Sequence, residues 1–134
     1  MANRLVTLKT RADFLRVAAG RRRAARPGLV LQAEPRPPAA DAGEKVRVGF
    51  TASRKVGNAV VRNRAKRRLR AAAAEILARD GRSGTDYVLI ARAGTGQRRY
   101  ADLVADLAGA LRQVERHAAA ATRPRRDEEG RDAC

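Results

Sequence analysis

The side chains of this chain best suited to chemistry are cations that could bind an anionic ligand. Between residues 54 and 70 the sequence carries eight basic residues and no acidic one. Arginine outnumbers lysine in this run, and a guanidinium group can donate two parallel hydrogen bonds to one phosphate. The eight are Arg54, Lys55, Arg62, Arg64, Lys66, Arg67, Arg68 and Arg70. Their types and spacing predict phosphate binding.

A helix must position most of these cations. Gly57 permits backbone angles closed to other residues, and Asn58 is a preferred N-cap, so we expect a helix from about residue 59 to 79. At about 100° per residue, one stripe of this helix is apolar and the opposite arc is basic. The expected apolar stripe is Val61, Ala65, Leu69, Ala72 and Ile76. Asn63 lies within the basic arc and could bind a base edge or a ribose hydroxyl.

The charges at the start of this helix argue for an anionic partner. The free N–H groups of a helix N-terminus favour acidic residues, yet only cations occur here. Such an arrangement costs stability unless a phosphate or similar group binds nearby. A solvated basic face without a ligand is the alternative reading, and the absence of acidic residues from the run weakens it.

The string KVGNAVVRNRAKR at residues 55–67 resembles the Arg-Asn-Arg signature of the protein subunit of bacterial ribonuclease P. The resemblance extends from about Arg4 to Val114. It implies an RNA-binding subunit whose partners are the catalytic RNA of ribonuclease P and precursor tRNA. In that family the RNA removes the 5′ leader of the precursor with Mg²⁺, so the ion would be held mainly by RNA and by no site on the protein.

The resemblance also implies two groups of site residues. Contacts with the catalytic RNA are expected from Arg54, Lys55, Arg62, Asn63, Arg64, Lys66, Arg67, Arg68 and Arg70. A groove for the leader is expected to contain Phe14, Arg16, Arg47 and Phe50. Core packing is an equally good reading for Phe14, and a better one for Phe50, which alternates with Val46 and Val48. Family members often carry a second aromatic four residues after the first, where this chain has Ala18, so arginines are expected to compensate.

The rest of the chain predicts a small α/β sandwich, with three helices packed against one sheet of about four strands. Expected helices cover residues 11–19, 59–79 and 100–116, and clear strands cover 29–33, 45–52 and 87–91. The resemblance implies a left-handed connection between the last two strands, whereas general rules favour a right-handed one.

Composition limits the remaining choices. The 134 residues and formal net charge of +16 suit one nucleic-acid-binding domain, expected over residues 1–117, followed by a disordered tail over 118–134. The only cysteine, Cys134, precludes an internal disulfide, and no metal-ligand cluster is evident. No signal peptide or membrane-spanning run is evident, so we expect a cytoplasmic protein that makes no membrane contact and is monomeric outside its RNA complex.

The sequence shows no catalytic constellation such as a Ser or Cys beside a His, or paired buried carboxylates. One alternative is therefore a ribosomal-type or general RNA-binding protein with no enzyme role. Another is a helix-turn-helix DNA-binding protein, which would require a helix, not a strand, before residue 59. A cationic membrane-surface protein is a third, but the apolar stripe is rich in alanine and poor in large anchoring residues.

Overall fold

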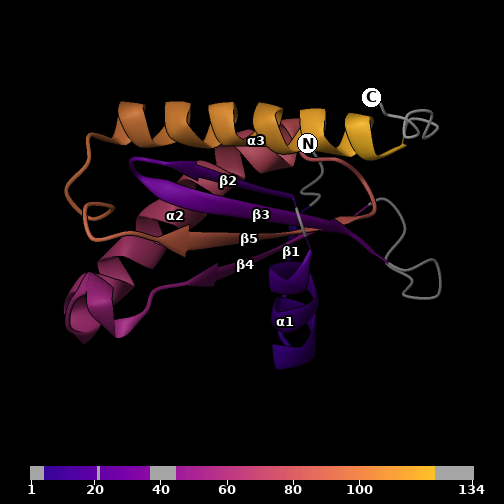
Figure 1. Ribbon diagram of the computed structural model, residues 1–134. Coiled ribbons are helices and arrows are strands. Elements are labelled where there is room, and N and C mark those ends of the chain that lie inside the picture. Colours follow the sequence, from indigo (N-terminus) through magenta and orange to yellow (C-terminus); the bar gives the residue numbers. More distant parts are fainter. Residues whose placement is uncertain (1–4, 21, 37–44, 123–134) are drawn as a thin grey trace, which may run out of the picture.

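The computed structural model describes residues 5–20, 22–36 and 45–122, with side chains up to residue 116. It contains one mixed sheet with helices on both faces (Figure 1). The strands are β1 (Leu5–Thr7), β2 (Arg22–Arg26), β3 (Leu29–Pro35), β4 (Val46–Thr51) and β5 (Thr85–Ala91). The helices are α1 (Arg11–Ala19), α2 (Ala59–Asp80) and α3 (Tyr100–Thr122), and a 3-10 turn, η1 (Arg54–Val56), precedes α2.

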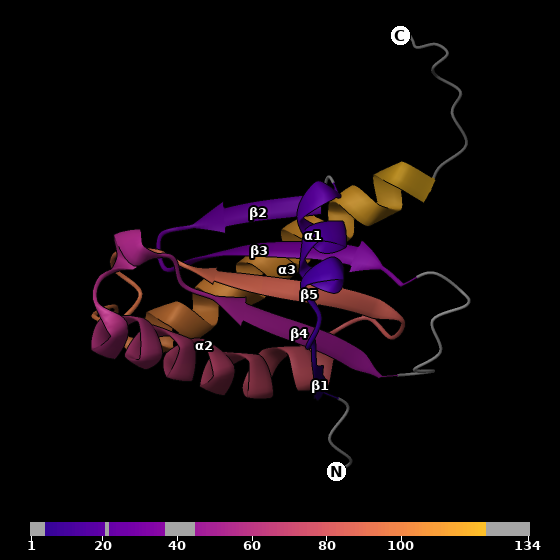
Figure 2. The ribbon, with the colours of Figure 1, turned by 90° about the horizontal axis from the view of Figure 1, so that it is seen from below.

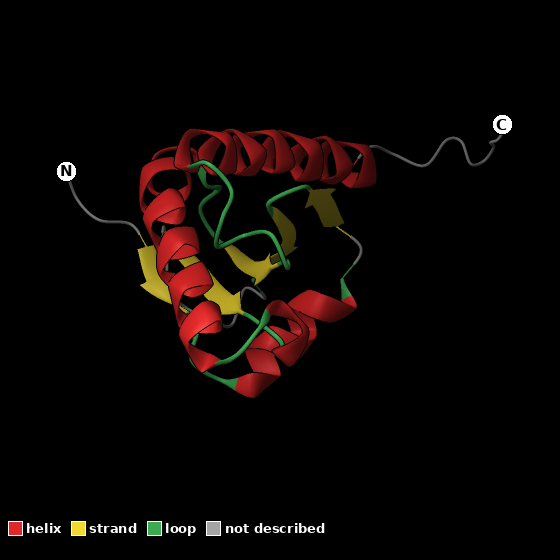
Figure 3. Ribbon diagram, turned by 90° about the vertical axis from the view of Figure 1, so that its left-hand side faces the viewer, coloured by secondary structure: helices red, strands yellow, loops and turns green. Residues whose placement is uncertain are grey.

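The strand order is β1-β4-β5-β3-β2. Strands β1, β4 and β5 are parallel, and β3 is antiparallel to both β5 and β2. The predicted α/β sandwich is confirmed, and β5, the most apolar strand, is central as its composition indicates. The connection from β4 through α2 to β5 is left-handed, as the resemblance implied (Figures 1 and 3).

The expectation of about four strands was low by one. Strand β2 reads RRAAR and buries only Ala24, so it lacks the apolar alternation that identifies strands. It is held by pairing with β3 across a two-residue turn at Pro27 and Gly28. Strand β1 has only three residues and depends on its parallel pairing with β4, which no local pattern reveals.

Helices α2 and α3 cover one face of the sheet, and α1 lies on the opposite face (Figures 2 and 3). The main core lies between the sheet and the α2/α3 pair, and β4 contributes Val46 and Val48 to it. Alanines at 65, 72 and 73 are fully buried and let α2 approach the sheet closely. A smaller cluster of Leu8, Val17 and Val88 lies beneath α1.

Two boundaries differ from the sequence-based expectations. Helix α3 continues to Thr122, beyond the predicted end at residue 116 and into the segment expected to be a tail. The remainder of that segment, including Cys134, lies outside the described residues, as do Arg21 and residues 37–44. No helix within the described ranges has the length and apolarity needed to cross a membrane.

Candidate nucleic-acid interface

A sharp turn sets the direction in which α2 leaves the sheet. Gly57 has φ +151°, and a Cβ atom there would lie 2.8 Å from Cβ of Val61, so only glycine fits. Asn58 then caps the helix as predicted: its Oδ1 accepts a hydrogen bond from the Val61 N–H at 3.0 Å. Ser53 caps the preceding 3-10 turn, accepting from the Lys55 N–H at 3.3 Å.

The faces of α2 are divided largely as the sequence predicts. Ala65, Leu69, Ala72 and Ile76 are buried in the core. Val61 was wrongly assigned to the buried stripe and is 37% exposed, since it packs against the turn at Gly57. Of the residues expected to contact the catalytic RNA, the exposed ones are Arg54, Lys55, Asn63, Arg64, Arg67 and Arg70, and the half-buried ones are Arg62, Lys66 and Arg68.

The carboxylates that the structure describes leave these cations unneutralised. Among the side chains that the structure describes, none of the eight basic residues between 54 and 70 forms an ion pair with a carboxylate. The first turn of α2 also contains no acidic residue. The end of α2 nearest η1 therefore presents both the positive end of the helix dipole and a group of uncompensated cations.

Two of the predicted RNA-binding arginines also hold the loop between β5 and α3. Arg64 Nε donates to the Gly96 carbonyl at 3.1 Å, and Arg68 donates to the carbonyls of Thr95 and Arg98. Buried Thr95 fixes the same loop by donating to the Gly28 carbonyl at 2.7 Å. Arg68 is therefore partly committed to structure, which its place in a basic run did not reveal.

This loop also carries cations of its own. Arg92 and Arg99 are exposed, and neither was identified from the sequence as a site residue. Arg92 donates to the Arg26 carbonyl at 2.8 Å, whereas Arg98 pairs with Asp106 at 2.6 Å. The hydrogen bonds from Arg64 and Arg68 hold the loop backbone against α2, and sequence spacing alone gave no signal for this docking.

Phe50 does not lie in the predicted groove. It packs against the main core on the α2 side of β4, and Cζ of Arg70 lies 5.0 Å from the centre of its ring. This cation–π contact is worth about 0.5–1 kcal/mol at an exposed site and steadies Arg70 on the helix surface. The alternation of β4 correctly indicated core packing for this residue.

Phe14 lies on the other face of the sheet, as the groove requires. Thr10 caps α1 by accepting from the Asp13 N–H at 3.2 Å, and the helix then places Phe14 over Gly49 of β4. A pocket of about 360 Å³ is lined here by Lys9, Arg11, Phe14 and Thr51. An aromatic ring beside two cations suits a nucleotide, through stacking and phosphate contact. Lys9, Arg11 and Thr51 were not identified from the sequence.

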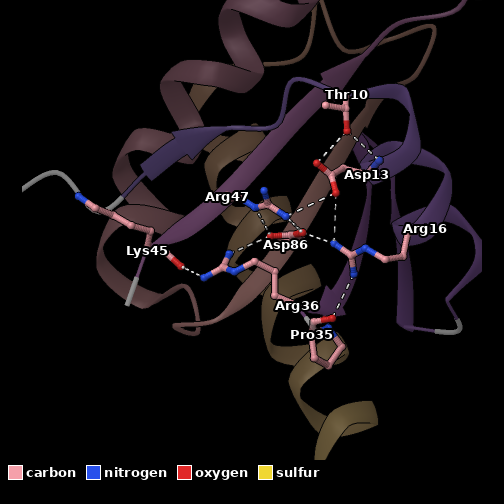
Figure 4. Close-up of polar contacts among 8 residues, drawn as sticks. All are labelled: Thr10, Asp13, Arg16, Pro35, Arg36, Lys45, Arg47 and Asp86. Atoms are coloured by element: carbon pink, nitrogen blue, oxygen red, sulfur yellow. Dashed lines mark hydrogen bonds and ion pairs between the residues drawn. The ribbon is translucent and has the colours of Figure 1, made fainter. Parts of the chain in front are cut away.

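Arg16 and Arg47, the two groove arginines, are engaged with an internal carboxylate. Both bind Asp86 of β5, whose side chain is fully buried (Figure 4). Arg47 donates Nε to Oδ1 at 2.9 Å and Nη2 to Oδ2 at 2.7 Å. Arg36 donates Nη1 to Oδ1 at 2.9 Å. Burial raises the pKa of Asp86, but the hydrogen bonds from Arg47 and Arg36 and the charge of Arg16 outweigh it, so the net pKa is lowered.

Comparison with known proteins is consistent with this arrangement. A family model described as Ribonuclease P matches residues 2–115. The chain belongs to the ribonuclease P protein family. The ribonuclease P protein component of Paramagnetospirillum magneticum is 54% identical over 114 residues, covering 85% of this chain and 86% of the relative. That of Gluconacetobacter diazotrophicus is 50% identical, covering 85% of this chain and 95% of the relative.

Solved structures of the family share the fold. The ribonuclease P protein of Staphylococcus aureus matches with a TM-score of 0.63 and 24% identity, over 79% of this chain and 92% of the other. That of Thermotoga maritima matches with a TM-score of 0.62 and 22% identity, over 79% and 94%. Family membership disfavours the alternative of an RNA-binding protein unrelated to an enzyme. The helix-turn-helix alternative fails because α2 follows β4 and η1.

Proposed function

We propose that the basic face of α2 binds the catalytic RNA of ribonuclease P, and that the pocket beside Phe14 receives the 5′ leader of precursor tRNA. The observation that carries this proposal is the unpaired state of the cations between residues 54 and 70. Six of these basic residues lie in α2 and two in η1, and none has a carboxylate partner among the described side chains. Such a surface gains most from a polyanion, whose phosphates also complement the helix dipole.

The two surfaces suit different parts of the RNA. The α2 surface offers a row of charges for a folded phosphate backbone. The pocket beside Phe14 instead offers one ring with flanking cations, which favours single-stranded RNA of varied sequence. Asn63 is exposed on α2 and is the polar residue best placed to read a base edge or ribose.

The protein would assist the reaction without supplying reactive groups. Within the described residues, no group of three or more His, Cys, Asp or Glu side chains gathers to hold a metal. We expect Mg²⁺ to be held mainly by the RNA, where it would supply activated water for cleavage of the phosphodiester bond. Cations of α2 would reduce the repulsion between the RNA strands that approach this centre. We propose that the complex acts in the cytoplasm with a single copy of this chain.

Reconstitution tests this proposal. The full chain is added to a bacterial ribonuclease P RNA at a Mg²⁺ concentration too low for the RNA alone, and removal of the 5′ leader is followed. We expect restored cleavage with the wild-type chain and greatly reduced cleavage with the double variant Arg62→Ala, Arg67→Ala. The matched control is Arg79→Ala, which removes a cation at the far end of α2 that is paired with Asp80.

The outcomes separate the candidate functions. No stimulation at any protein-to-RNA ratio would remove the proposal. RNA binding without stimulation of cleavage would favour a general RNA-binding protein instead. Equal loss of cleavage in the Arg79→Ala variant would show that total charge matters more than the α2 surface.

A further inference from the structure

Asp86 is a fully buried carboxylate whose hydrogen bonds come from three separate segments of the chain. Arg16 lies in α1, Arg36 follows β3, and Arg47 lies in β4. Together they donate four hydrogen bonds to the two carboxylate oxygens. A carboxylate offers about four acceptor positions, so this one is saturated. Its role in the fold is to join α1, the end of β3, β4 and β5 at one place (Figure 4).

The surroundings orient each arginine further. Arg16 Nη1 donates to the Pro35 carbonyl at 3.1 Å, and Arg36 Nη2 donates to the Lys45 carbonyl at 2.8 Å. Asp13 of α1 lies 3.5 Å from Nη2 of Arg47 and 3.9 Å from Nη2 of Arg16. Three guanidinium groups thus face two carboxylates. The cluster has a formal charge of +1, so a buried Asp86 does not leave this face of the sheet acidic.

Apolar packing alone holds α1 only weakly. The helix has nine residues, of which only Val17 is buried. Phe14 is half-buried, and Leu15 is 54% exposed. The apolar cluster beneath α1 is small. The position of α1 relative to β4 therefore depends strongly on the ion pairs made by Asp13 and Arg16.

The same two elements form the pocket. Phe14 lies between Asp13 and Arg16 along α1, and its ring rests on Gly49, two residues after Arg47 in β4. The pocket wall continues to Thr51 on the same strand. A shift of α1 that followed loss of the ion pairs would therefore move the ring relative to Thr51.

We propose that Asp86 is a positioning residue for single-stranded RNA: by holding Arg16 and Arg47 it fixes α1 against β4 and keeps the Phe14 pocket at the width of one nucleotide. Asp86 itself is buried and touches no RNA. The inference rests on the proposed role of the pocket in leader binding. On this inference Asp86, although negatively charged, favours the binding of a polyanion.

The Asp86→Asn variant tests this inference, because positioning and simple electrostatics predict opposite signs. The substitution adds one positive charge, which by itself would strengthen RNA binding. Positioning instead predicts that the affinity for precursor tRNA carrying a leader falls about tenfold, or about 1.4 kcal/mol in binding free energy. Affinity for mature tRNA and for the RNA subunit should not change. Binding is measured with the reconstituted complex, and folding is checked by circular dichroism.

Asp106→Asn is the matched control. Asp106 is also a buried carboxylate, paired with Arg98 and accepting from the Gly28 N–H at 2.9 Å, but it lies in the α3 layer. This variant adds the same charge and removes the ion pair of a carboxylate on the other face of the sheet, so it should leave the preference for leader-bearing tRNA unchanged. Should Asp86→Asn not fold, Arg16→Lys keeps the charge, loses the planar fork and should reduce the preference partially.

The results distinguish the two proposals. If the wild-type complex shows no preference for leader-bearing tRNA, the proposed role of the pocket is wrong. If the wild type shows the preference and the folded Asp86→Asn complex retains it, or binds the leader more tightly, the positioning role is wrong. An equal loss in Asp106→Asn would also overturn it, because reduced stability would then account for both.

Discussion

Phe14 lies directly over Gly49: a Cβ atom on residue 49 would approach Cε1 and Cζ of the Phe14 ring to 2.4 Å. The two residues belong to α1 and β4, on the face of the sheet opposite α2 and α3. Glycine at this position of β4 therefore leaves room for the ring to rest against the sheet. This contact sets the depth of the pocket proposed for the leader.

Substituting Gly49 with Ala should displace the ring and weaken leader binding. Such an insertion into a packed contact costs about 1–3 kcal/mol, part of which is relieved if the ring moves outward. Urea unfolding measures the change in stability. The affinities of the reconstituted complex for leader-bearing and for mature tRNA show whether binding of the leader is weakened. Gly94→Ala is the control, since a Cβ there meets no atom within 4 Å. Unchanged leader affinity in a destabilised Gly49→Ala protein would contradict the proposed pocket.

Removing cations from α2 should change the salt dependence of RNA binding. Each lost phosphate contact lowers the slope of log affinity against log salt by about one unit. The variants Arg62→Ala and Arg67→Ala are suited to this test because neither side chain makes a hydrogen bond or ion pair within the described part of the fold. Filter binding to the RNA subunit across a salt series gives the slope. The slope for Arg79→Ala should equal that of the wild type.

The part of the site predicted correctly from sequence is the part specified by local signals. Gly57 and Asn58 set the start of α2, and four of the five positions that its helical periodicity assigned to the apolar stripe are buried. Val61 was the exception because the first turn packs against Gly57 and does not reach the core. The stripe did not include Ala73 and Leu77, which are also buried. The alternation of Phe50 with Val46 and Val48 correctly favoured core packing for this residue.

The parts that were missed depend on contacts between distant residues. Asp86 is the only acidic residue in the apolar strand β5, which could have signalled a buried charge needing a cationic partner. Its partners lie 39 to 70 positions away, so no local pattern among the 30 basic residues could identify them. Arg92 and Arg99, in the loop that docks on α2, were missed for the same reason.

Arg68 should contribute more to stability than its neighbour Arg67. Its guanidinium donates to the carbonyls of Thr95 and Arg98, which would lose these partners in Arg68→Ala. Leaving such groups unsatisfied costs about 1–3 kcal/mol, whereas removal of exposed Arg67 should change the free energy of unfolding by less than about 0.5 kcal/mol. Urea denaturation of the free proteins in the same buffer compares the two. Equal stability of both variants would show that Arg68 does not hold the loop.

Acid should remove the stabilising effect of the Asp86 cluster. The folded-state pKa of Asp86 is lowered, with burial outweighed by hydrogen bonds from Arg47 and Arg36 and by the charge of Arg16. A lowered pKa means that the contribution is fully present above the unfolded value of about 4, and is lost as pH falls through the folded value. The difference in the free energy of unfolding between the wild type and Asp86→Asn should therefore be constant near neutral pH and shrink below about pH 4.

Urea unfolding of both proteins at a series of pH values measures this difference directly. Other carboxylates titrate in both proteins, so their contributions largely cancel in the comparison. Asp13, which faces Arg16 and Arg47, is the one most able to respond to the substitution, and the double variant Asp13→Asn, Asp86→Asn measures that coupling. Parallel stability curves down to about pH 2 would mean that the charge of Asp86 does not stabilise the fold. The position of α1 would then have to depend on the packing of Phe14 and Val17 alone.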